Sequence, residues 1–461
     1  MVTSLFWFRR DLRISDHPAL AFAARRGPVV PVFVIEPQRF GSAGPARRPF
    51  LLDCLQELNH ALSGRLTVLV GDPAEELIRL AQLVGSTQVV ATGEVSPSGQ
   101  IRDGRVGTTL RELGIDLQCI DTPYLTAPGQ ILNGSGQPFK VFTPYWKAAA
   151  KLGVVAPLGE VVGEWVDTGQ PLDLDQLRAL PDLSSSLVSA IDAPVPTSLP
   201  RGGEKAAWGR LQDFLGRVDT YGENRNLPGV DGSSRLSPDL HFGTLHPRQI
   251  LAEVAMGTEG REAFVRQVYW REFYGDVAAN RPDAVWSDLN PNRVLVDEGT
   301  DTQERFSAWA LGQTGYPLVD AGMRQLLSEG WMHNRVRMLA ASFLVKDLHL
   351  PWQWGAKWFL HRLVDGDVAN NNHGWQWTAG VGTDASPYYR VFNPTLQAER
   401  FDPEGIYIRR HVSELKDVEA PAVLQPGGGV SGSLLSNGYS APMLDHAVER
   451  EEALRRLDLA R

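Results

Sequence analysis

Residues 365–377 have a composition that suits chemistry better than packing. The segment reads DGDVANNNHGWQW and holds two carboxylates, three consecutive amides, a histidine and two tryptophans within 13 residues. Carboxylates and amides accept or donate several hydrogen bonds, and indoles offer large faces for stacking. We therefore expect a ligand to bind here, and we take this segment as the centre of a functional site.

A second polar cluster lies in residues 233–238, which read SSRLSP and follow Tyr221 in the same half of the chain. A serine-rich turn ahead of a helix presents hydroxyls and backbone N–H groups to an anion, which suits a phosphate or a diphosphate. Ser-Pro at a helix start is more often the pattern of a plain cap. The residues alone leave both interpretations open.

Composition and charge limit the class of protein. A chain of 461 residues exceeds the usual size of one hydrophobic core, so we expect two domains. Only Cys54 and Cys119 occur, without metal-ligand spacing, which argues against a disulfide framework and predicts no metal site. The net charge of −9 weighs against general coating of nucleic acid, but it allows a local basic groove.

The N-terminus, MVTSLFWFRR, lacks the basic and apolar regions of a signal peptide, and no run of about 18 apolar residues occurs. We therefore expect a cytoplasmic protein that does not enter a membrane. Thirteen tryptophans are unusual, and nine of them fall between Trp270 and Trp377. Such clustering in a polar region points to more than core packing.

The elements that position these residues follow from periodicity. Short apolar runs at 3–8, 29–35, 66–70, 88–91 and 116–120 predict strands, and segments at 18–25, 49–62, 74–84 and 102–113 predict the helices between them. This alternation indicates βαβ units in a doubly wound parallel sheet. No GxGxxG or Walker motif occurs. Ligands of such sheets lie beyond the carboxyl ends of the strands, so the loop at 8–13 is a candidate contact.

The second half has helical periodicity throughout. Predicted helices occupy 206–219, 247–256, 262–279, 303–311, 317–328, 333–347 and 354–363, with a short charged helix at 445–461. Residues 126–200 are rich in Pro, Gly, Ser and Asp. The expected organisation is an α/β domain at 1–125, a connector at 126–200 and an all-α domain at 201–461.

Four further motifs join these clusters: WREFY at 270–274, TGYPLVDAGM at 314–323, GWMHNRVRM at 330–338 and GVGTDASPYYRVFNP at 380–394. With the opening FWFRRDLR at 6–13, they resemble the photolyase/cryptochrome family in order and spacing. The similarity is greatest to the bacterial class I cyclobutane pyrimidine dimer DNA photolyases, and it extends from about residue 3 to 415. All that follows is what this resemblance implies.

The resemblance implies FAD in the all-α domain, with FADH− as the active state. The 233–237 segment would hold the diphosphate, Arg337 and Asp365 would form a charge pair beside the isoalloxazine, and Asp347 would be a further counter-charge to Arg337. Asn371 would face flavin N5, where an amide favours repair over signalling. The matching cofactor positions are Tyr221, Ser233, Ser234, Arg235, Leu236, Ser237, Arg271, Asn334, Arg337, Asp365, Gly366, Asp367 and Asn371.

Three tryptophans match the family's electron-transfer chain: Trp375, Trp352 and Trp309. The chain carries an electron from the protein surface to an excited oxidised flavin, and Trp309 is expected at its surface end.

The partner implied is ultraviolet-damaged DNA, bound by a monomer. Trp270 and Trp377 would stack on a flipped dimer, because aromatic faces replace the stacking that an extruded base loses. The matching catalytic positions are Trp270, Asn334, Met338, Asn371 and Gln267. The matching DNA-binding positions are Gln267, Trp270, Arg335, Trp377, Arg390 and Gln397, of which Arg335, Arg390 and Gln397 would contact the backbone.

Gln267 departs from the family pattern. Cyclobutane dimer photolyases usually carry a glutamate at this place, three residues before the pocket tryptophan, and an amide cannot act as a protonated acid. A (6-4) photolyase therefore stays an alternative, although Met338 stands where those enzymes place histidine. A cryptochrome photoreceptor that does not repair DNA is the other alternative.

The family also commonly holds an antenna chromophore, a folate or a deazaflavin, against the α/β domain. Arg9, Arg10 and Asp103 are candidate contacts, but residues 92–103 follow neither known pattern closely. The identity of an antenna stays open.

Overall fold

The protein was studied as a computed structural model that describes residues 3–170, 172–290, 296–297, 299, 301–383, 390–429 and 438–459. The chain forms two compact units. Unit 1 comprises Met1–Ser184, Pro200–Gly216 and Ser234–Pro282, and unit 2 comprises Ser185–Leu199, Arg217–Ser233 and Asp283–Arg461.

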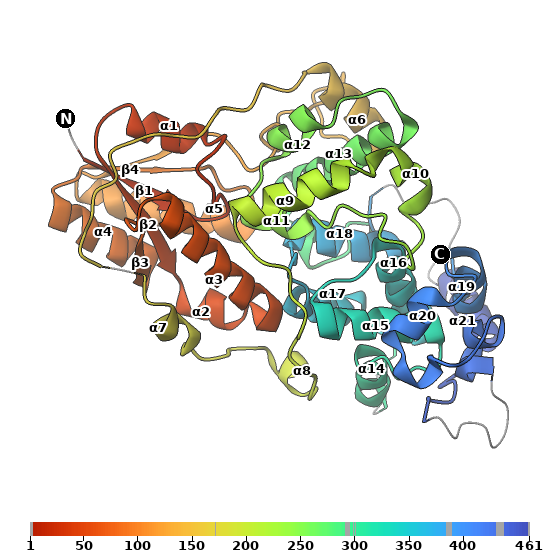
Figure 1. The fold of residues 1–461 in the computed structure, drawn as a ribbon. Helices are drawn as coiled ribbons and strands as arrows, with labels where there is room; N and C mark the ends of the chain where they lie inside the picture. Colours follow the sequence, from red (N-terminus) through yellow and green to blue (C-terminus); the bar gives the residue numbers. More distant parts are fainter. Residues whose placement is uncertain are drawn as a thin grey trace. The chain divides into compact units, whose positions relative to one another are not determined.

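Unit 1 contains a five-stranded sheet in the order β3-β2-β1-β4-β5, with every neighbouring pair parallel. The central strand β1 pairs Leu5 with Val30 of β2 on one side and with Val89 of β4 on the other (Figure 1). This sheet confirms the α/β fold predicted for the N-terminal part. The strands are β1 (Ser4–Phe8), β2 (Val29–Ile35), β3 (Thr67–Val70), β4 (Gln88–Ala91) and β5 (Asp116–Cys119).

The helices between the strands form because their apolar positions recur on one face. In α4, Leu77, Leu80 and Ala81 are fully buried in one hydrophobic cluster with the sheet. The side chain of Asp72 caps this helix by accepting from Ala74 N at 2.9 Å. The helices of this part are α1 (Pro18–Ala24), α2 (Pro37–Gly41), α3 (Gly44–Ala61), α4 (Pro73–Val84) and α5 (Pro97–Glu112).

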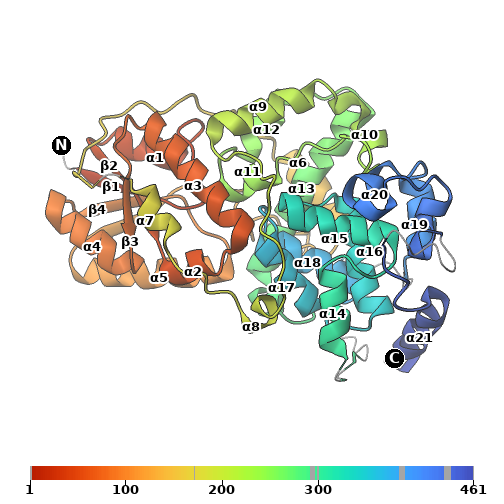
Figure 2. The same cartoon turned by 60° about the horizontal axis from the view of Figure 1, so that its bottom comes forward.

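Further helices of unit 1 follow in the sequence (Figure 2), and some of them pack against the α/β part: α9, for example, contacts α3. Helices from the second half of the sequence thus belong to unit 1, and the predicted domain limits at 125 and 200 stay a prediction. These helices are α6 (Phe142–Lys151), α7 (Leu174–Arg178), α9 (Glu204–Leu215), α11 (Ser237–Phe242), α12 (Pro247–Glu253) and α13 (Glu259–Asn280).

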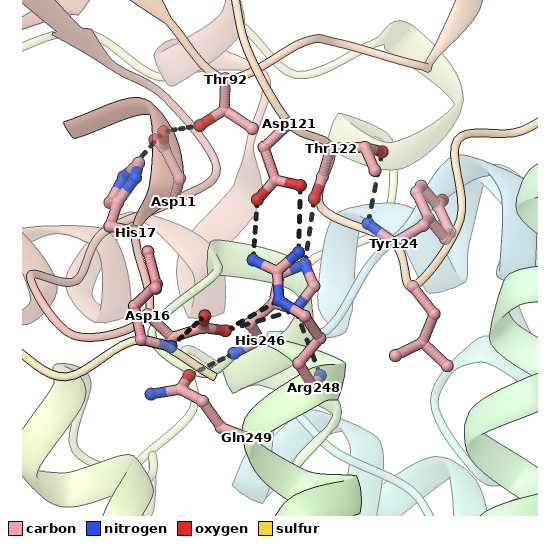
Figure 3. A network of polar contacts seen from close by, with 12 residues as sticks. Asp11, Asp16, His17, Thr92, Asp121, Thr122, Tyr124, His246, Arg248 and Gln249 are labelled. Atoms are coloured by element: carbon pink, nitrogen blue, oxygen red, sulfur yellow. Dashed lines mark hydrogen bonds and ion pairs between the residues drawn. The ribbon is translucent and has the colours of Figure 1, made fainter. Parts of the chain in front are cut away.

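A buried polar network joins α12 to the carboxyl ends of the strands (Figure 3). Arg248 donates to both carboxylate oxygens of Asp121, at 3.0 and 2.7 Å, and to Asp16 at 3.2 Å. Asp11, just beyond β1, accepts from the hydroxyl of Thr92 at 2.6 Å. These charge-assisted bonds leave the edge of the sheet firmly attached to the helices of unit 1.

Unit 2 is helical in its described part, and its core is one cluster centred on α15, α16 and α17. Its longer helices are α14 (Thr302–Ala310), α15 (Pro317–Glu329), α16 (Asn334–Ser342), α17 (Trp352–Arg362), α18 (Val368–Ala379), α19 (Pro394–Phe401) and α21 (His446–Leu459). Its short elements are α8 (Ser186–Ser189), η1 (Val218–Thr220), α10 (Tyr221–Asn224), η2 (Pro282–Val285), η3 (Phe343–Asp347), α20 (Ile406–His411), η4 (Ser413–Leu415), η5 (Ala422–Leu424) and η6 (Pro426–Gly429).

The predicted all-α second half is confirmed, and most predicted helices lie within a few residues of the observed ones. The important addition is α18, which was not among the predicted helices although it holds most of the 365–377 segment. Within the described ranges, no helix combines the length and apolar character needed to cross a membrane.

Candidate cofactor and nucleic-acid site

The 365–377 segment is a turn followed by α18, and this helix packs against α16 and α17. Asp367 begins the helix as its N-cap: its carboxylate accepts from Asn370 N at 2.9 Å and from the Asn370 amide at 2.8 Å. Asp367, one of the two carboxylates of this segment, therefore has a structural role as a helix cap. Gly366, next to it, leaves little room for a side chain, since an added Cβ would lie 3.0 Å from Leu360 O.

The other carboxylate, Asp365, forms a two-pronged ion pair with Arg337 of α16. The guanidinium donates to the two carboxylate oxygens at 3.2 and 2.9 Å, and its Nε donates to Met332 O at 2.8 Å. The Asp365 side chain is buried and that of Arg337 is one-quarter exposed. The charge of Arg337 on α16 and that of Asp365 in the turn before α18 are thus held in one fixed plane.

Asp347 was expected to balance Arg337 as well, but its observed partner is different. It lies at the end of η3, and its carboxylate bonds to Nδ1 of His446 at the start of the C-terminal helix. Burial raises the pKa of Asp347 to about 6, against the lowering effect of His446. Asp347 therefore holds α21 in place, and Arg337 is paired with Asp365.

The other side-chain amides of α18 differ in their burial and hydrogen-bond partners. The Asn371 side chain is half-buried and donates to Ala356 O at 3.1 Å. Asn372 is fully buried and donates to Val285 O at 2.7 Å, and Gln376 similarly donates to Ala284 O at 2.7 Å. Asn372 and Gln376 thus fasten α18 to η2, a structural role that the sequence did not reveal.

The tryptophan arrangement corrects one expectation. Trp309 was expected at the protein surface, but its side chain is fully buried and its Nε1 donates to Ala340 O at 3.0 Å. Its ring centroid lies 6.1 Å from that of Trp375, and both rings contact Phe359. Trp309 is therefore a direct neighbour of Trp375 in the core of unit 2.

Trp375 comes close to α17 because that helix has a glycine at the contact. A Cβ on Gly355 would lie 2.1 Å from the Trp375 ring, which is far inside van der Waals contact. The third tryptophan, Trp352, is also buried and donates from Nε1 to Asp288 at 2.9 Å.

The remaining predicted positions of unit 2 lie nearer the surface. Asn334 is exposed and its amide contacts the sulfur of Met338, one turn along α16, at 3.8 Å. Trp377, Met338 and Gln397 are half-buried, and Arg390 is exposed. Residues 384–389 of the 380–394 motif lie outside the described residues.

Arg335 lies near two other arginines, Arg225 and Arg400. Its guanidinium lies 4.5 Å from the ring centroid of Phe401 and donates to Asn226 at 2.6 Å. Burial and the charges of Arg225 and Arg400 lower the pKa of Arg335. A local cluster of positive charge thus exists in a protein whose net charge is negative.

In unit 1, α13 carries three predicted site residues. Gln267 is half-buried, and its amide makes a long 3.5 Å bond to Ala263 O of its own helix. Trp270, one turn further, is half-buried against Phe142. The guanidinium of Arg271 donates to Leu240 O at 3.2 Å and to Glu272 at 3.1 Å.

The predicted diphosphate segment is a turn that runs into α11. Ser233 and Ser234 are half-buried, and the hydroxyl of Ser234 accepts from Leu236 N at 3.4 Å. Arg235 is exposed with a left-handed φ of 52°, and Ser237 is the exposed first residue of the helix. Tyr221 begins α10 and is half-buried; burial raises its pKa.

Comparison with known proteins decides the family. Residues 4–160 match the family model described as DNA photolyase, and residues 264–458 match the FAD binding domain of DNA photolyase. A protein called deoxyribodipyrimidine photo-lyase from Streptomyces griseus is 40% identical, and the match covers 99% of this chain and 100% of that protein. A protein of the same name from Vibrio cholerae is 37% identical, with 98% of both chains covered. The chain belongs to the DNA photolyase family.

Solved structures of family members agree. A class III photolyase from Agrobacterium tumefaciens has a TM-score of 0.89 at 33% identity, with 100% of this chain and 98% of that chain covered. A Synechocystis cryptochrome has a TM-score of 0.86 at 29% identity, with 99% of both chains covered. The predicted resemblance and fold are thereby confirmed, while the narrower assignment to class I stays a prediction.

The residues of unit 2 fit the FAD that this photolyase domain binds. The Arg337–Asp365 pair, the half-buried amide of Asn371 and the indole of Trp375 all come from α16, α18 and the turn between Leu363 and Asp367, within one set of packed helices. This combination of a fixed cation, a neutral amide and a buried aromatic ring suits a polar, planar cofactor.

Sequence reasoning missed Glu272, which is fully buried beside Arg271. Burial raises its pKa to about 7, although Arg271 and the backbone N–H of Leu125, donating at 2.6 Å, pull it down. The motif WREFY contains this glutamate, but only the packing shows that it anchors the start of the connector. The antenna candidates also have internal partners: Arg9 pairs with Asp103 and with Thr92 O, and Arg10 donates to His241 O at 3.0 Å.

Proposed function

We propose that this photolyase-family protein repairs ultraviolet-damaged DNA by splitting cyclobutane pyrimidine dimers in a light-dependent reaction. The observation that carries the proposal is identity of 34–40% along essentially the whole chain to bacterial proteins named deoxyribodipyrimidine photo-lyase. Reduced FAD, when bound, would supply the light-driven one-electron chemistry for ring splitting, with no net redox change over the cycle.

The proposed FAD contacts would act on different parts of the cofactor. Arg337 would balance negative charge on the isoalloxazine, with Asp365 fixing the plane of its guanidinium. Asn371 would hydrogen-bond N5, and Asp367 would keep α18 in register for it. The other proposed FAD contacts are Tyr221, Ser233, Ser234, Arg235, Leu236, Ser237, Arg271, Asn334 and Gly366.

The proposed electron-transfer residues are Trp375, Trp352 and Trp309. Support comes from their burial in one core and from the contact between Trp375 and Trp309. Because Trp309 is buried, its proposed place is beside Trp375 and no longer at the surface.

The DNA contacts are proposed residue by residue. Trp270 and Trp377, both half-buried, are each proposed to stack on a lesion base. Asn334 and Met338 are further proposed lesion contacts. Gln267 would donate to a pyrimidine carbonyl. Arg335, Arg390 and Gln397 would contact the backbone, where positive charge gives salt-dependent affinity without sequence preference. A cytoplasmic monomer remains part of this proposal.

Two alternatives have specific support. Gln267, in place of the usual glutamate, favours a (6-4) photolyase. The likeness to the Synechocystis cryptochrome favours a photoreceptor without repair activity. The amide of Asn371 and the methionine at position 338 argue for dimer repair over both.

The test is repair of a synthetic oligonucleotide that contains one defined lesion. Chemically reduced protein is incubated with a cyclobutane dimer or a (6-4) product, in light and in the dark. The proposal predicts restoration of the dimer in light only. Repair of the (6-4) product alone supports the first alternative, and repair of neither by FAD-loaded protein supports the second.

A further inference from the structure

Within unit 1, Trp270 belongs to a row of flat groups that α6 and α13 build together. The ring of Phe142 lies 3.9 Å from that of Trp270, centroid to centroid, with 10° between the planes. The ring of Trp146 is parallel to Phe142 within 4°, at 6.5 Å. The guanidinium of Arg266 lies over Trp146 at 4.6 Å from the ring centroid.

The row forms because two helices contribute residues at the same spacing. Phe142 and Trp146 are four residues apart on α6, and Arg266 and Trp270 are four residues apart on α13, so each pair shares one helix face. The helices contact each other and lie side by side in both ribbon views (Figures 1 and 2). Phe142 thus stacks with Trp146 of its own helix and with Trp270 of α13.

The inner part of the row is buried and tightly packed. Phe142 is 1% exposed, and Phe273, fully buried, meets the rings of both Phe142 and Trp270 edge-on, at 6.0 and 5.8 Å. The outer part is accessible, since Trp146 is half-buried and Arg266 is exposed.

The chain that leads to α6 is itself anchored on α13. Glu272 accepts from Leu125 N, and Asp276 accepts from Gly129 N, each at 2.6 Å. A Cβ on Gly275 would lie 2.4 Å from the ring of Tyr124, so the backbone of α13 closely approaches this segment. The segment before α6 is therefore held against the C-terminal half of α13.

Resting on the proposed function, in which Trp270 stacks on a lesion base, we infer that Trp146 and Arg266 are positioning residues for Trp270. They act through Phe142: Arg266 stacks on Trp146, which supports the Phe142 ring against one face of Trp270. A half-buried tryptophan with a fixed plane loses less conformational freedom when a base stacks on it. The row therefore strengthens binding of the flipped lesion and has no effect on undamaged duplex.

Two other roles for the same residues have different signatures. If Trp146 only stabilises the packing of α6, its loss lowers thermal stability without changing the preference for damaged DNA. If Arg266 only contacts phosphate, its loss weakens binding to damaged and undamaged DNA equally and reduces the salt dependence of both.

The test measures dark binding of FAD-loaded protein to two duplexes that are identical except for one cyclobutane dimer, by fluorescence anisotropy. The variants are Trp146→Ala, Trp146→Phe, Arg266→Lys and Arg266→Gln, and Lys147→Ala is an exposed control on α6. We expect Trp146→Ala to weaken binding to the dimer duplex by about fivefold, as for loss of one aromatic stacking contact, with binding to the undamaged duplex unchanged. Trp146→Phe restores the preference.

Arg266→Lys keeps the charge and loses the planar stack, so it also lowers the preference for the dimer duplex while the salt dependence stays the same. This variant changes an exposed residue and keeps the test decisive if Trp146→Ala does not fold. The inference is overturned if a variant loses the same affinity for both duplexes. It is also overturned if Trp146→Ala or Arg266→Lys binds the dimer duplex as tightly as the unmodified protein does. If the unmodified protein repairs dimers and prefers the dimer duplex, only the inference fails; if it does neither, the proposed function fails with it.

Discussion

The rings of Trp309 and Trp375 meet at 71°, with 6.1 Å between their centroids, inside the core of unit 2. We expect Trp309→Phe to slow light-driven reduction of the oxidised flavin, because an oxidisable indole next to Trp375 is removed. Repair by chemically reduced protein should persist. The smaller ring also leaves a cavity, which should lower the free energy of unfolding by about 2 kcal/mol.

Trp358→Phe is the matched control for this effect, since Trp358 is equally buried in the same cluster. It should show a similar loss of stability with normal photoreduction, measured by flavin absorbance under illumination. Equal slowing of photoreduction in both variants would show that the packing of the cluster matters and the indole of Trp309 does not.

The charge pair between Arg337 and Asp365 should stabilise both the protein and its flavin. Asp365→Asn leaves Arg337 without a counter-charge on a side chain that is one-quarter exposed, so we expect a loss of about 2 kcal/mol, between the values for exposed and buried pairs. Bound FAD per protein, measured by absorbance after desalting, should fall. Asp175→Asn removes an exposed pair with Arg178 and should change stability by less than about 0.5 kcal/mol. Wild-type flavin content in Asp365→Asn would contradict the assigned role.

Truncation of the adjacent amides Asn371 and Asn372 in α18 should lower stability in both cases but slow repair only for Asn371. Asn372→Ala removes a fully buried hydrogen bond to Val285 O, so we expect a loss of about 2 kcal/mol with normal repair per bound flavin. Asn371→Ala should lower stability by about 1 kcal/mol and slow repair per bound flavin. Urea unfolding and single-turnover repair give the two readouts, and a repair defect confined to Asn372→Ala would refute the assignment.

Glu272 should give the protein a distinct pH dependence. Its pKa is raised from 4.5 to about 7 by burial, so between these values the folded state binds more protons than the unfolded state. Stability contributed by this group is therefore greatest below about pH 4.5 and falls as pH rises through 7, by roughly 3 kcal/mol in all.

Glu272→Gln should remove that downward slope, as measured by urea unfolding at several pH values. Glu262→Gln, an exposed change on the same helix, should leave the wild-type profile intact. An unchanged slope in Glu272→Gln would mean that the carboxylate is not protonated in the folded protein at neutral pH.

Periodicity was sufficient to predict the sheet and most helices, because apolar positions such as Leu77 and Leu80 of α4 recur with helical spacing. It failed for α18, where buried amides take the places of apolar side chains. Asn372 and Gln376 can be buried because η2 supplies carbonyl partners 87 and 92 positions earlier in the chain. Hydrogen bonds between residues so far apart in the chain leave no pattern in the local sequence.

The site was predicted through motifs rather than through geometry, and this explains what was missed. The resemblance paired Arg337 with Asp365, which the structure shows. It gave no information on burial, so Trp309 was placed at the surface and Asp347 beside the wrong partner. Exposure and pairing depend on which helices pack together, and the partner of Asp347 lies at His446, about a hundred positions further along the chain.

The central claim is that the protein splits dimers with an electron that returns after each cycle. The direct test is repair in light and without oxygen, by protein whose bound FAD has been reduced beforehand. The dimer-containing oligonucleotide is in large excess, and no electron donor is added. The account predicts many dimers repaired per protein with the flavin still reduced at the end. Repair that stops at one dimer or fewer per protein, with the flavin oxidised, would contradict it.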